Sequence, residues 1–304
     1  ASDVYKRQDM SFTKLRSIYK IQTGRNFEES DYESFGIIDE NGFLTNAGAL
    51  LADESPIRHS RLFCTRWNGL DKAPGIVDAI DDKEYNGGLI NLLQSGIEFV
   101  NNNSKKMWKK THNSRIEMPD YPERAVLEGI VNALIHRNYL ELGSEVHIDM
   151  FDNRLEIYSP GGMCDGSRVQ DRDIMKVPSR RRNPFIADIF NRLKFMDRRG
   201  SGFKKILSDY RDNEFYIKEL DPIFYSDNDS FLLILKNINY YYDITDTYKR
   251  TAKKTQQNIV KIIAYLTDHN GATSKEIANI LKLSTSRTRS ILCLLYTSPS
   301  PRDL

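Results

Sequence analysis

Three polar residues recur at four-residue intervals within one short segment, at Glu128, Asn132 and His136. With 3.6 residues per turn, this spacing puts their side chains on one face of a helix. A carboxylate can accept a proton from water, and an amide oxygen can ligate Mg²⁺. The segment could therefore activate water beside a metal ion. The alternative is a solvated helix face, because a glutamate four residues before an asparagine is common in helices.

The other residues of this predicted helix, 123–138, indicate how the helix would pack against the rest of the protein. A continuous apolar stripe on the opposite side is wide enough to dock the helix on a sheet. The stripe consists of Val126, Leu127, Ile130, Val131, Leu134 and Ile135. Ala125, Gly129 and Ala133 lie between the polar residues, and their small size would let another group approach the helix backbone. We interpret His136 as a structural hydrogen-bonding residue rather than a general base.

Two glycine-containing motifs follow this helix in the chain. Ser159-Pro160-Gly161-Gly162 ends a predicted strand, and Gly200-Ser201-Gly202 opens a predicted helix. Glycine allows a backbone to approach phosphate closely, and a helix N-terminus favours anions. Between the motifs, Arg180-Arg181-Arg182 precedes a helix with Pro184 in its first turn. Guanidinium groups bind phosphate well, and Arg182 is the candidate contact; the alternative is a solvated basic loop.

Helices and strands alternate along the predicted elements, which indicates an α/β class. Strands are expected at 60–69, 114–118, 145–151 and 154–159, with at least two more before residue 237, and helices at 84–102 and 185–196 and, in short pieces, within 9–56. Asp152-Asn153 is a two-residue hairpin signal between alternating segments. These elements predict a sheet that carries the candidate helix on its surface.

The ordered motifs resemble a known domain family. The stretches PERAVLEGIVNALIHRNYLELGSEVHIDMFDNRLEIYSPGGM (122–163) and RRNPFIADIFNRLKFMDRRGSGFKKI (181–206) are similar to the RecG-like C-terminal domain. That domain is a divergent branch of the gyrase B, MutL and histidine-kinase (GHKL) ATPase superfamily. The stretch FGIIDENGFLTNAGALLADESPIRHSRLFCTRWNG (35–69) resembles the segment before this domain in proteins with a Schlafen-type AlbA domain. The resemblance covers roughly residues 30–237. It implies an α+β sandwich of Bergerat type, with a mixed sheet, helices on one face and nucleotide between them.

The resemblance also implies roles for particular residues. Glu128 corresponds to the water-activating glutamate, Asn132 to the Mg²⁺-binding asparagine, and Gly200, Ser201 and Gly202 to the glycine-rich phosphate loop. Ser159, Gly161 and Gly162 stand where the superfamily has D-x-G-x-G. The aspartate that reads the adenine amino group is absent, with Ser159 nearest its place and Asp165 as an alternative acceptor. ATP and Mg²⁺ are the implied ligands.

Residues 255–292 have the pattern of a small helical module. Thr273 with Glu276 forms a capping-box sequence, Ile277, Ala278 and Leu281 should face inward, and Ser284 can cap a third helix. Between residues 249 and 291, nine lysines and arginines stand against Asp268 and Glu276. This basic module resembles a winged helix, with DNA as the expected partner. The candidate DNA contacts are Ser284, Thr285, Ser286, Arg287 and Arg289; the alternative is a protein-interaction module.

The remaining features limit the classes of function. The sequence has no G-x-x-x-x-G-K-[ST] motif, so it lacks the P-loop of a motor helicase. No run of about 18 apolar residues predicts a membrane span, and Cys64, Cys164 and Cys293 are scattered without a C-x-x-C pair. A cytoplasmic protein is therefore expected. ASDVYKRQ and CLLYTSPSPRDL at the two ends resemble translated sequencing adapter, so we expect the natural protein to differ there; the alternative is an ordinary frayed tail.

These observations predict an ordered set of segments and two functional hypotheses. The segments are adapter-like residues 1–8, a helical segment 9–59, a GHKL-like domain 60–240, a linker 241–254, a helix-turn-helix 255–292 and adapter-like residues 293–304. The first hypothesis is an ATP-binding transcriptional regulator with slow Mg²⁺-dependent hydrolysis and DNA binding. The second is a non-catalytic scaffold for homodimerisation or ligand sensing, whose output is DNA or protein binding.

Overall fold

The computed structural model describes residues 5–72, 77–110, 112, 114–178, 180–197, 201–242, 254–255, 257–259, 261–262, 265–266, 269 and 271–297. The chain divides into two compact units, residues 1–241 and 242–304. The predicted linker at 241–254 lies mostly outside the described residues.

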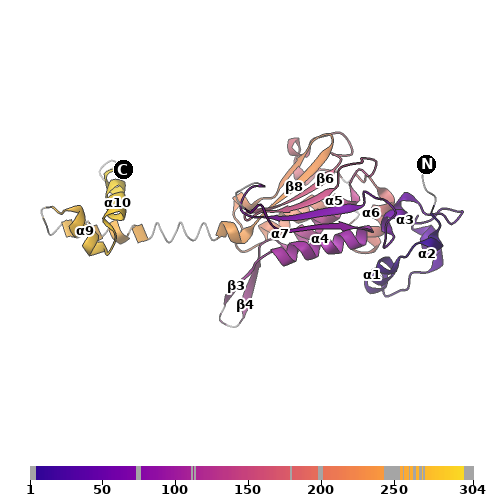
Figure 1. Ribbon diagram of the computed structural model, residues 1–304, viewed down its shortest axis with the longest axis horizontal. Coiled ribbons are helices and arrows are strands. Elements are labelled where there is room, and N and C mark those ends of the chain that lie inside the picture. The colour runs from indigo at the N-terminus through magenta and orange to yellow at the C-terminus, as the bar shows by residue number, and fades with distance from the viewer. Residues whose placement is uncertain are drawn as a thin grey trace. The chain divides into compact units, whose positions relative to one another are not determined.

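The first unit is built on a mixed six-stranded sheet (Figure 1). Its strands are β1 (Arg61–Trp67), β2 (Ala79–Asn86), β5 (Val146–Met150), β6 (Arg154–Pro160), β7 (Ile223–Ser226) and β8 (Ser230–Lys236). Their order is β2-β1-β5-β6-β8-β7, and among these neighbours only β1 and β5 run parallel. The predicted hairpin at Asp152-Asn153 joins β5 to β6, where Met150 pairs with Leu155. The expected mixed α/β architecture is therefore confirmed.

Helices cover one face of this sheet. α4 (Leu89–Asn103) packs against β1, β2 and β5, α5 (Glu123–Ile135) packs against β6 and β8, and α7 (Gly202–Arg211) packs beside α5. Burial alternates along β6: Leu155, Ile157 and Ser159 are buried towards the helices, while Glu156 and Tyr158 are half-buried. This alternation is typical of a sheet with one covered face. α6 (Pro184–Arg192) follows the arginine-rich loop and has Pro184 at its start, as the sequence predicted.

The N-terminal helices belong to the same hydrophobic core as the sheet. They are α1 (Thr13–Thr23), α2 (Glu29–Ser34) and α3 (Asn46–Leu51), with four short 3₁₀ helices elsewhere in the described chain: η1 (Arg7–Asp9), η2 (Val169–Asp171), η3 (Ile174–Lys176) and η4 (Lys218–Leu220). Phe12, Leu15 and Leu50 join the cluster that contains the β1 residue Leu62. Thr45 caps α3 by accepting a hydrogen bond from the Gly48 N–H.

One predicted helix boundary is wrong. Residues 84–86 were expected to open the helix over 84–102, but they end strand β2, and α4 begins at Leu89. Gly87 has a φ of +113° and Gly88 is the helix N-cap. A Cβ on Gly88 would lie 2.2 Å from the Ala52 carbonyl oxygen. The glycine pair therefore separates strand from helix, and close packing requires glycine there.

The second unit has its own small core. α9 (Ser274–Leu281) and α10 (Thr285–Thr297) pack through Ile262, Ile277, Leu281 and Ile291. Thr273 and Glu276 form the predicted capping box, and Ser284 accepts a hydrogen bond from the Arg287 N–H at 3.4 Å. Lys282 adopts a left-handed conformation, with φ of +52°, where the chain turns between the helices. The described part of the chain contains no helix long and apolar enough to span a membrane.

Candidate functional site

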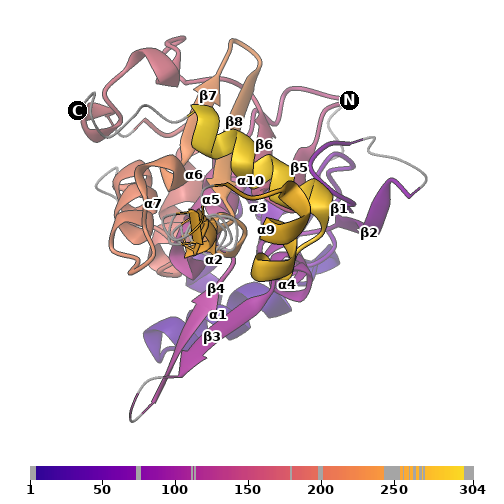
Figure 2. The same ribbon diagram turned by 90° about the vertical axis from the view of Figure 1, so that its left-hand side faces the viewer.

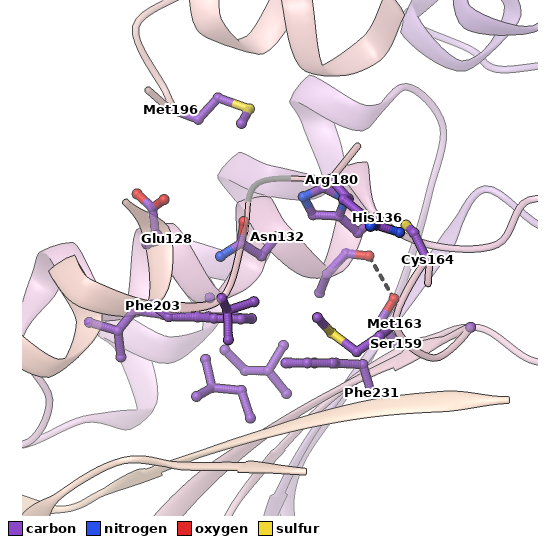
Figure 3. A pocket seen from close by; sticks show the side chains of 18 of the residues that line it. Glu128, Asn132, His136, Ser159, Met163, Cys164, Arg180, Met196, Phe203 and Phe231 are labelled. Atoms are coloured by element: carbon purple, nitrogen blue, oxygen red, sulfur yellow. Dashed lines mark hydrogen bonds between the residues drawn. The ribbon is translucent and has the colours of Figure 1, made fainter. Parts of the chain in front are cut away.

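A pocket lies between the helices and the covered face of the sheet (Figure 3). α5, the end of β6 with the loop that follows it, β8 and the start of α7 contribute its walls. Its lining residues are Glu128, Gly129, Asn132, Ala133, His136, Ile157, Ser159, Gly161, Gly162, Met163, Cys164, Asp165, Val177, Pro178, Arg180, Met196, Asp197, Gly202, Phe203, Ile206, Phe231 and Leu233. Most of the residues predicted for the site from the sequence therefore line one cavity.

Glu128, Asn132 and Gly202 meet at one end of this pocket. A Cβ built on Gly202 would lie 2.8 Å from Glu128 Oε1 and 3.1 Å from Asn132 Nδ2. The first residue of α7 is thus in contact distance of both side chains, although about seventy residues separate it from α5. The structure brings together the carboxylate, the amide and the helix N-terminus that the sequence placed in separate motifs.

The environment of Glu128 suits a proton acceptor. Its side chain is only 7% exposed, and burial raises the pKa of the carboxyl above its ordinary value. The Lys205 ammonium lies 3.6 Å from Glu128 Oε2 and opposes this rise, while the Asp197 carboxylate adds to it. Lys205 also pairs with Asp197 Oδ2 at 2.7 Å. A carboxyl with a raised pKa is better matched to proton abstraction near neutral pH.

Asn132 and His136 lie along the same wall of the pocket. Among the described residues, none forms a hydrogen bond with the Asn132 amide, and this leaves its oxygen available to a metal ion. Burial, with the nearby cations Arg182 and Arg181, lowers the pKa of His136 to about 4. His136 is therefore neutral at physiological pH, and its role as a structural hydrogen-bonding residue stays a prediction.

The small residues of α5 have a different purpose from the one predicted. A Cβ on Gly129 would lie 2.8 Å from Leu233 Cδ2 and 2.9 Å from Ile157 Cδ1. The group that approaches the helix closely is therefore the sheet itself. Gly129 brings α5 down onto β6 and β8, and this close approach sets the depth of the pocket beside Asn132.

The SPGG motif is shaped by contacts within the protein. The Ser159 hydroxyl is buried and donates a hydrogen bond to the Ala133 carbonyl at 2.8 Å (Figure 3). Gly161 has a φ of +98°, and a Cβ on Gly162 would lie 1.9 Å from the Asp227 carbonyl oxygen. Backbone packing against the β7–β8 turn therefore explains why residues 161 and 162 are glycines. The Ser159 oxygen keeps lone pairs that can accept a hydrogen bond from a ligand.

The arginine-rich loop divides its roles differently from the prediction. Arg180 lines the pocket, whereas Arg182 does not. The Arg182 guanidinium instead donates a hydrogen bond to the Gly162 carbonyl at 2.7 Å and so stabilises the glycine turn. Asp165 lines the pocket, but its carboxylate is engaged by Ser167 and by Arg172 at 3.0 Å, with Arg180 at 3.8 Å. These contacts lower the pKa of Asp165, with the Ser167 hydrogen bonds as the largest cause.

The glycine-rich loop is described only from its second residue. Gly200 lies outside the described residues, Ser201 is the N-cap of α7, and Gly202 is its first residue. The first amides of a helix lack partners within that helix and bind anions. Because Gly202 and Phe203 line the pocket, the start of α7 lies at the end that holds Glu128 and Asn132.

Sequence reasoning missed the apolar part of the pocket. Phe203 and Phe231 stack with ring centroids 5.8 Å apart and an interplanar angle of 2°, and Met163, Ile157 and Leu233 add apolar lining. In Figure 3 Ser159 and Met163 lie near Phe231, away from Glu128. The continuous apolar run over residues 231–235 of β8 was a usable signal, but it indicates only a buried strand and not a ligand.

The pocket's donor set fits a nucleotide with its metal ion. The polar end offers a carboxylate, an amide oxygen and helix amides, and the other end is apolar with one buried hydroxyl. Within the described ranges, no cluster of three or more His, Cys, Asp or Glu side chains could hold a metal. Mg²⁺ in nucleotide sites needs only one or two protein oxygens because phosphates and water complete its shell. Asn132 meets that requirement.

Comparison with known families agrees with this geometry. Residues 143–235 match the family described as "Putative ATP-dependent DNA helicase recG C-terminal". This segment is a RecG C-terminal-like domain. It is a divergent ATPase-type domain that contains Ser159 and Gly202, while Glu128 and Asn132 lie just before the matched residues. The family to which it is similar is of a type that binds ATP.

A solved structure shares the fold. The DIP2311 protein from Corynebacterium diphtheriae superposes with a TM-score of 0.63 at 15% identity, over 96% of this chain and 58% of that one. The chain therefore spans a little more than half the length of that protein. Among proteins with curated functions, none is significantly similar to this chain.

The candidate DNA contacts lie on the second unit. Ser284, Ser286, Arg287 and Arg289 are exposed, and Thr285 is half-buried. At 100° per residue, Arg287 and Arg289 are roughly 200° apart around α10. Thr288 between them is buried in the unit, so the two arginines flank the packed face. They cannot both face the same base pair.

Proposed function

We propose that the pocket of the first unit binds Mg²⁺-ATP. The observation that supports this most strongly is the convergence of Glu128, Asn132 and the start of α7 at Gly202. In this arrangement the α7 amides receive the phosphates, and Asn132 Oδ1 ligates the metal. The base lies on Phe231 and Met163, with Ser159 Oγ as the acceptor for an amino group.

We further propose slow ATP hydrolysis with Glu128 as general base. Mg²⁺, when bound, neutralises charge on the phosphates and polarises the bond that breaks. The Glu128 carboxylate accepts a proton from the attacking water, and Lys205 holds that carboxylate in position. Because the residue that usually reads adenine is replaced by Ser159, we expect weak preference for adenine over other bases.

Phosphate-release kinetics of the full chain test the catalytic part. Glu128→Gln should lower the turnover rate by about 10²–10⁴-fold, the usual contribution of a general base, and leave ATP affinity nearly unchanged. Glu123→Gln is the matched control, because Glu123 is on the exposed first turn of the same helix. Equal rates for wild type and Glu128→Gln would exclude hydrolysis by this site and favour the non-catalytic scaffold.

The second unit is the candidate DNA-binding part of the protein. α9 and α10 meet in a helix-turn-helix arrangement, and the exposed arginines of α10 lie in a segment with an excess of positive charge. We propose that this unit binds DNA, with one of Arg287 and Arg289 at base edges and the other at phosphate. The protein is then a nucleotide-responsive transcriptional regulator. An affinity for duplex DNA that does not fall with salt would contradict this assignment.

A further inference from the structure

The β3–β4 hairpin is a separate two-stranded ribbon on the first unit. β3 (Lys106–Lys110) pairs antiparallel with β4 (Arg115–Pro119), and neither strand joins the six-stranded sheet. Figures 1 and 2 both show the ribbon projecting away from the sheet and helices. An isolated two-stranded ribbon is only marginally stable in water, so a ribbon on the surface gains order when a partner covers it.

Strand register places the exposed charges on one face of the ribbon. Lys106, Trp108 and Lys110 alternate along β3, opposite Pro119, Glu117 and Arg115. Trp108 is 61% exposed, and Lys106, Lys110 and Arg115 are also exposed. On the opposite face Met118 is buried and Met107 half-buried. The ribbon therefore has a packed face and a solvent face that combines tryptophan with cations.

This solvent face carries an excess of positive charge, although Lys106 pairs with Glu123 at 3.9 Å. It contains three cations, Lys106, Lys110 and Arg115, and a single acidic residue, Glu117. Glu117 pairs with Arg115 at 2.6 Å, whereas no carboxylate of the described residues pairs with Lys110. Lys110 stands directly opposite Arg115, and like charges in that position destabilise a strand pair. A polyanion laid on this face would relieve that repulsion.

Duplex DNA fits the shape and chemistry of this face. The major groove, about 12 Å wide, admits a two-stranded ribbon, and the five residues of each strand extend about 17 Å. The sequence between the two strands, THNS at residues 111–114, is polar, whereas a segment that inserts into a membrane surface presents apolar and aromatic residues. Trp108 lies in mid-strand, where it would contact the groove wall.

We propose that the β3–β4 ribbon enters the major groove of duplex DNA, with Lys110 and Arg115 at phosphates. This contact is distinct from the one assigned to α10 and does not depend on nucleotide binding. A protein that holds DNA at both places would bind a longer site than the C-terminal unit alone.

Salt titration of affinity for a fluorescent 20-base-pair duplex tests the proposal on the full chain. Lys110→Gln/Arg115→Gln should weaken binding by tenfold or more and reduce the log–log salt slope by roughly 2, because two phosphate contacts are lost. The variant should melt within a few degrees of wild type, because loss of the exposed Arg115–Glu117 ion pair offsets removal of the like-charge pair. Lys14→Gln/Lys20→Gln, on the exposed side of α1, removes the same charge and should change neither quantity. Equal losses in the two variants, or no loss in the first, would overturn the proposal.

Tryptophan fluorescence provides a second and more local readout. The chain has two tryptophans, so Trp67→Phe leaves Trp108 as the sole reporter. Its emission should be quenched as DNA is added, and this should persist in an Arg287→Gln/Arg289→Gln background. Binding of DNA without a change in Trp108 emission would overturn the ribbon contact. So would a stronger blue-shifted response to phosphatidylserine vesicles than to DNA, which would identify a membrane surface instead.

Discussion

At the scale of single residues, two opposing influences act on the Glu128 carboxyl. Burial raises its pKa, and the Lys205 ammonium at 3.6 Å partly reverses that rise. Only the ionised carboxylate accepts a proton, so hydrolysis should increase as pH rises through the pKa of Glu128. The same raised pKa means that folding is favoured by the protonated form, and the free energy of unfolding should fall slightly as pH rises through this range.

Replacing Lys205 should therefore move the pH–rate profile. Lys205→Met removes the cation that favours the ionised form, so the rising limb should shift to higher pH and the rate at pH 7 should fall. Lys205→Arg should restore most of the profile, and Lys204→Met, which changes an exposed neighbour, should leave it in place. A Lys205→Met enzyme with an unchanged profile and a lower rate at every pH would indicate a merely structural role.

Gly202 offers a test of the packing at the polar end. Alanine there would place its Cβ 2.8 Å from Glu128 Oε1 and 3.1 Å from Asn132 Nδ2. The side chains of Glu128 and Asn132 would therefore have to shift. We expect Gly202→Ala to weaken Mg²⁺-ATP binding by roughly tenfold without lowering the melting temperature, because alanine is the better helix former. Ser208→Ala, on an exposed position of α7, is the control. Undiminished binding by Gly202→Ala would show that ligand does not occupy this end.

At the scale of elements, the segment that follows β6 places the Cys164 thiol in the wall of the pocket, where its reaction rate can report ligand binding. Cys164 is exposed and lines the cavity, Cys64 is fully buried, and Cys293 lies in the other unit. Iodoacetamide should label Cys164 about tenfold more slowly when Mg²⁺-ATP is present at ten times its Kd. Cys293 should react at the same rate with and without nucleotide. Equal labelling of Cys164 in both conditions would place the nucleotide elsewhere.

The sequence predicted the elements better than their contacts. Hairpin, capping and periodicity signals are local, so β5–β6, the Thr273 cap and α5 follow from a few neighbouring residues. The reason for Gly129 or Gly162 is not local, because each is required by a distant strand or turn. The same applies to Lys205, which meets Glu128 only after α5 and α7 pack together. The site's residues were therefore predictable as types, but their partners and the role of Arg182 were not.

At the scale of the whole molecule, nucleotide and C-terminal functions are assigned to separate compact units. Every residue that lines the pocket belongs to residues 1–241. A protein that ends at Tyr241 should therefore bind Mg²⁺-ATP within about twofold of the full chain, while its DNA affinity should fall but keep the contribution of the β3–β4 ribbon. Loss of ATP binding in the shortened protein, with its melting transition intact, would show that the second unit completes the site.

Calorimetric titration of the full chain with Mg²⁺-ATP tests whether the pocket of the first unit binds nucleotide. We expect one saturable site per chain, with affinity lost in Asn132→Ala and retained in Asn213→Ala, whose side chain accepts a hydrogen bond from the Phe215 N–H outside the pocket. The wild-type affinity should also fall when EDTA removes Mg²⁺. No saturable binding by the wild type, or equal binding by Asn132→Ala with and without metal, would contradict the assignment of this pocket.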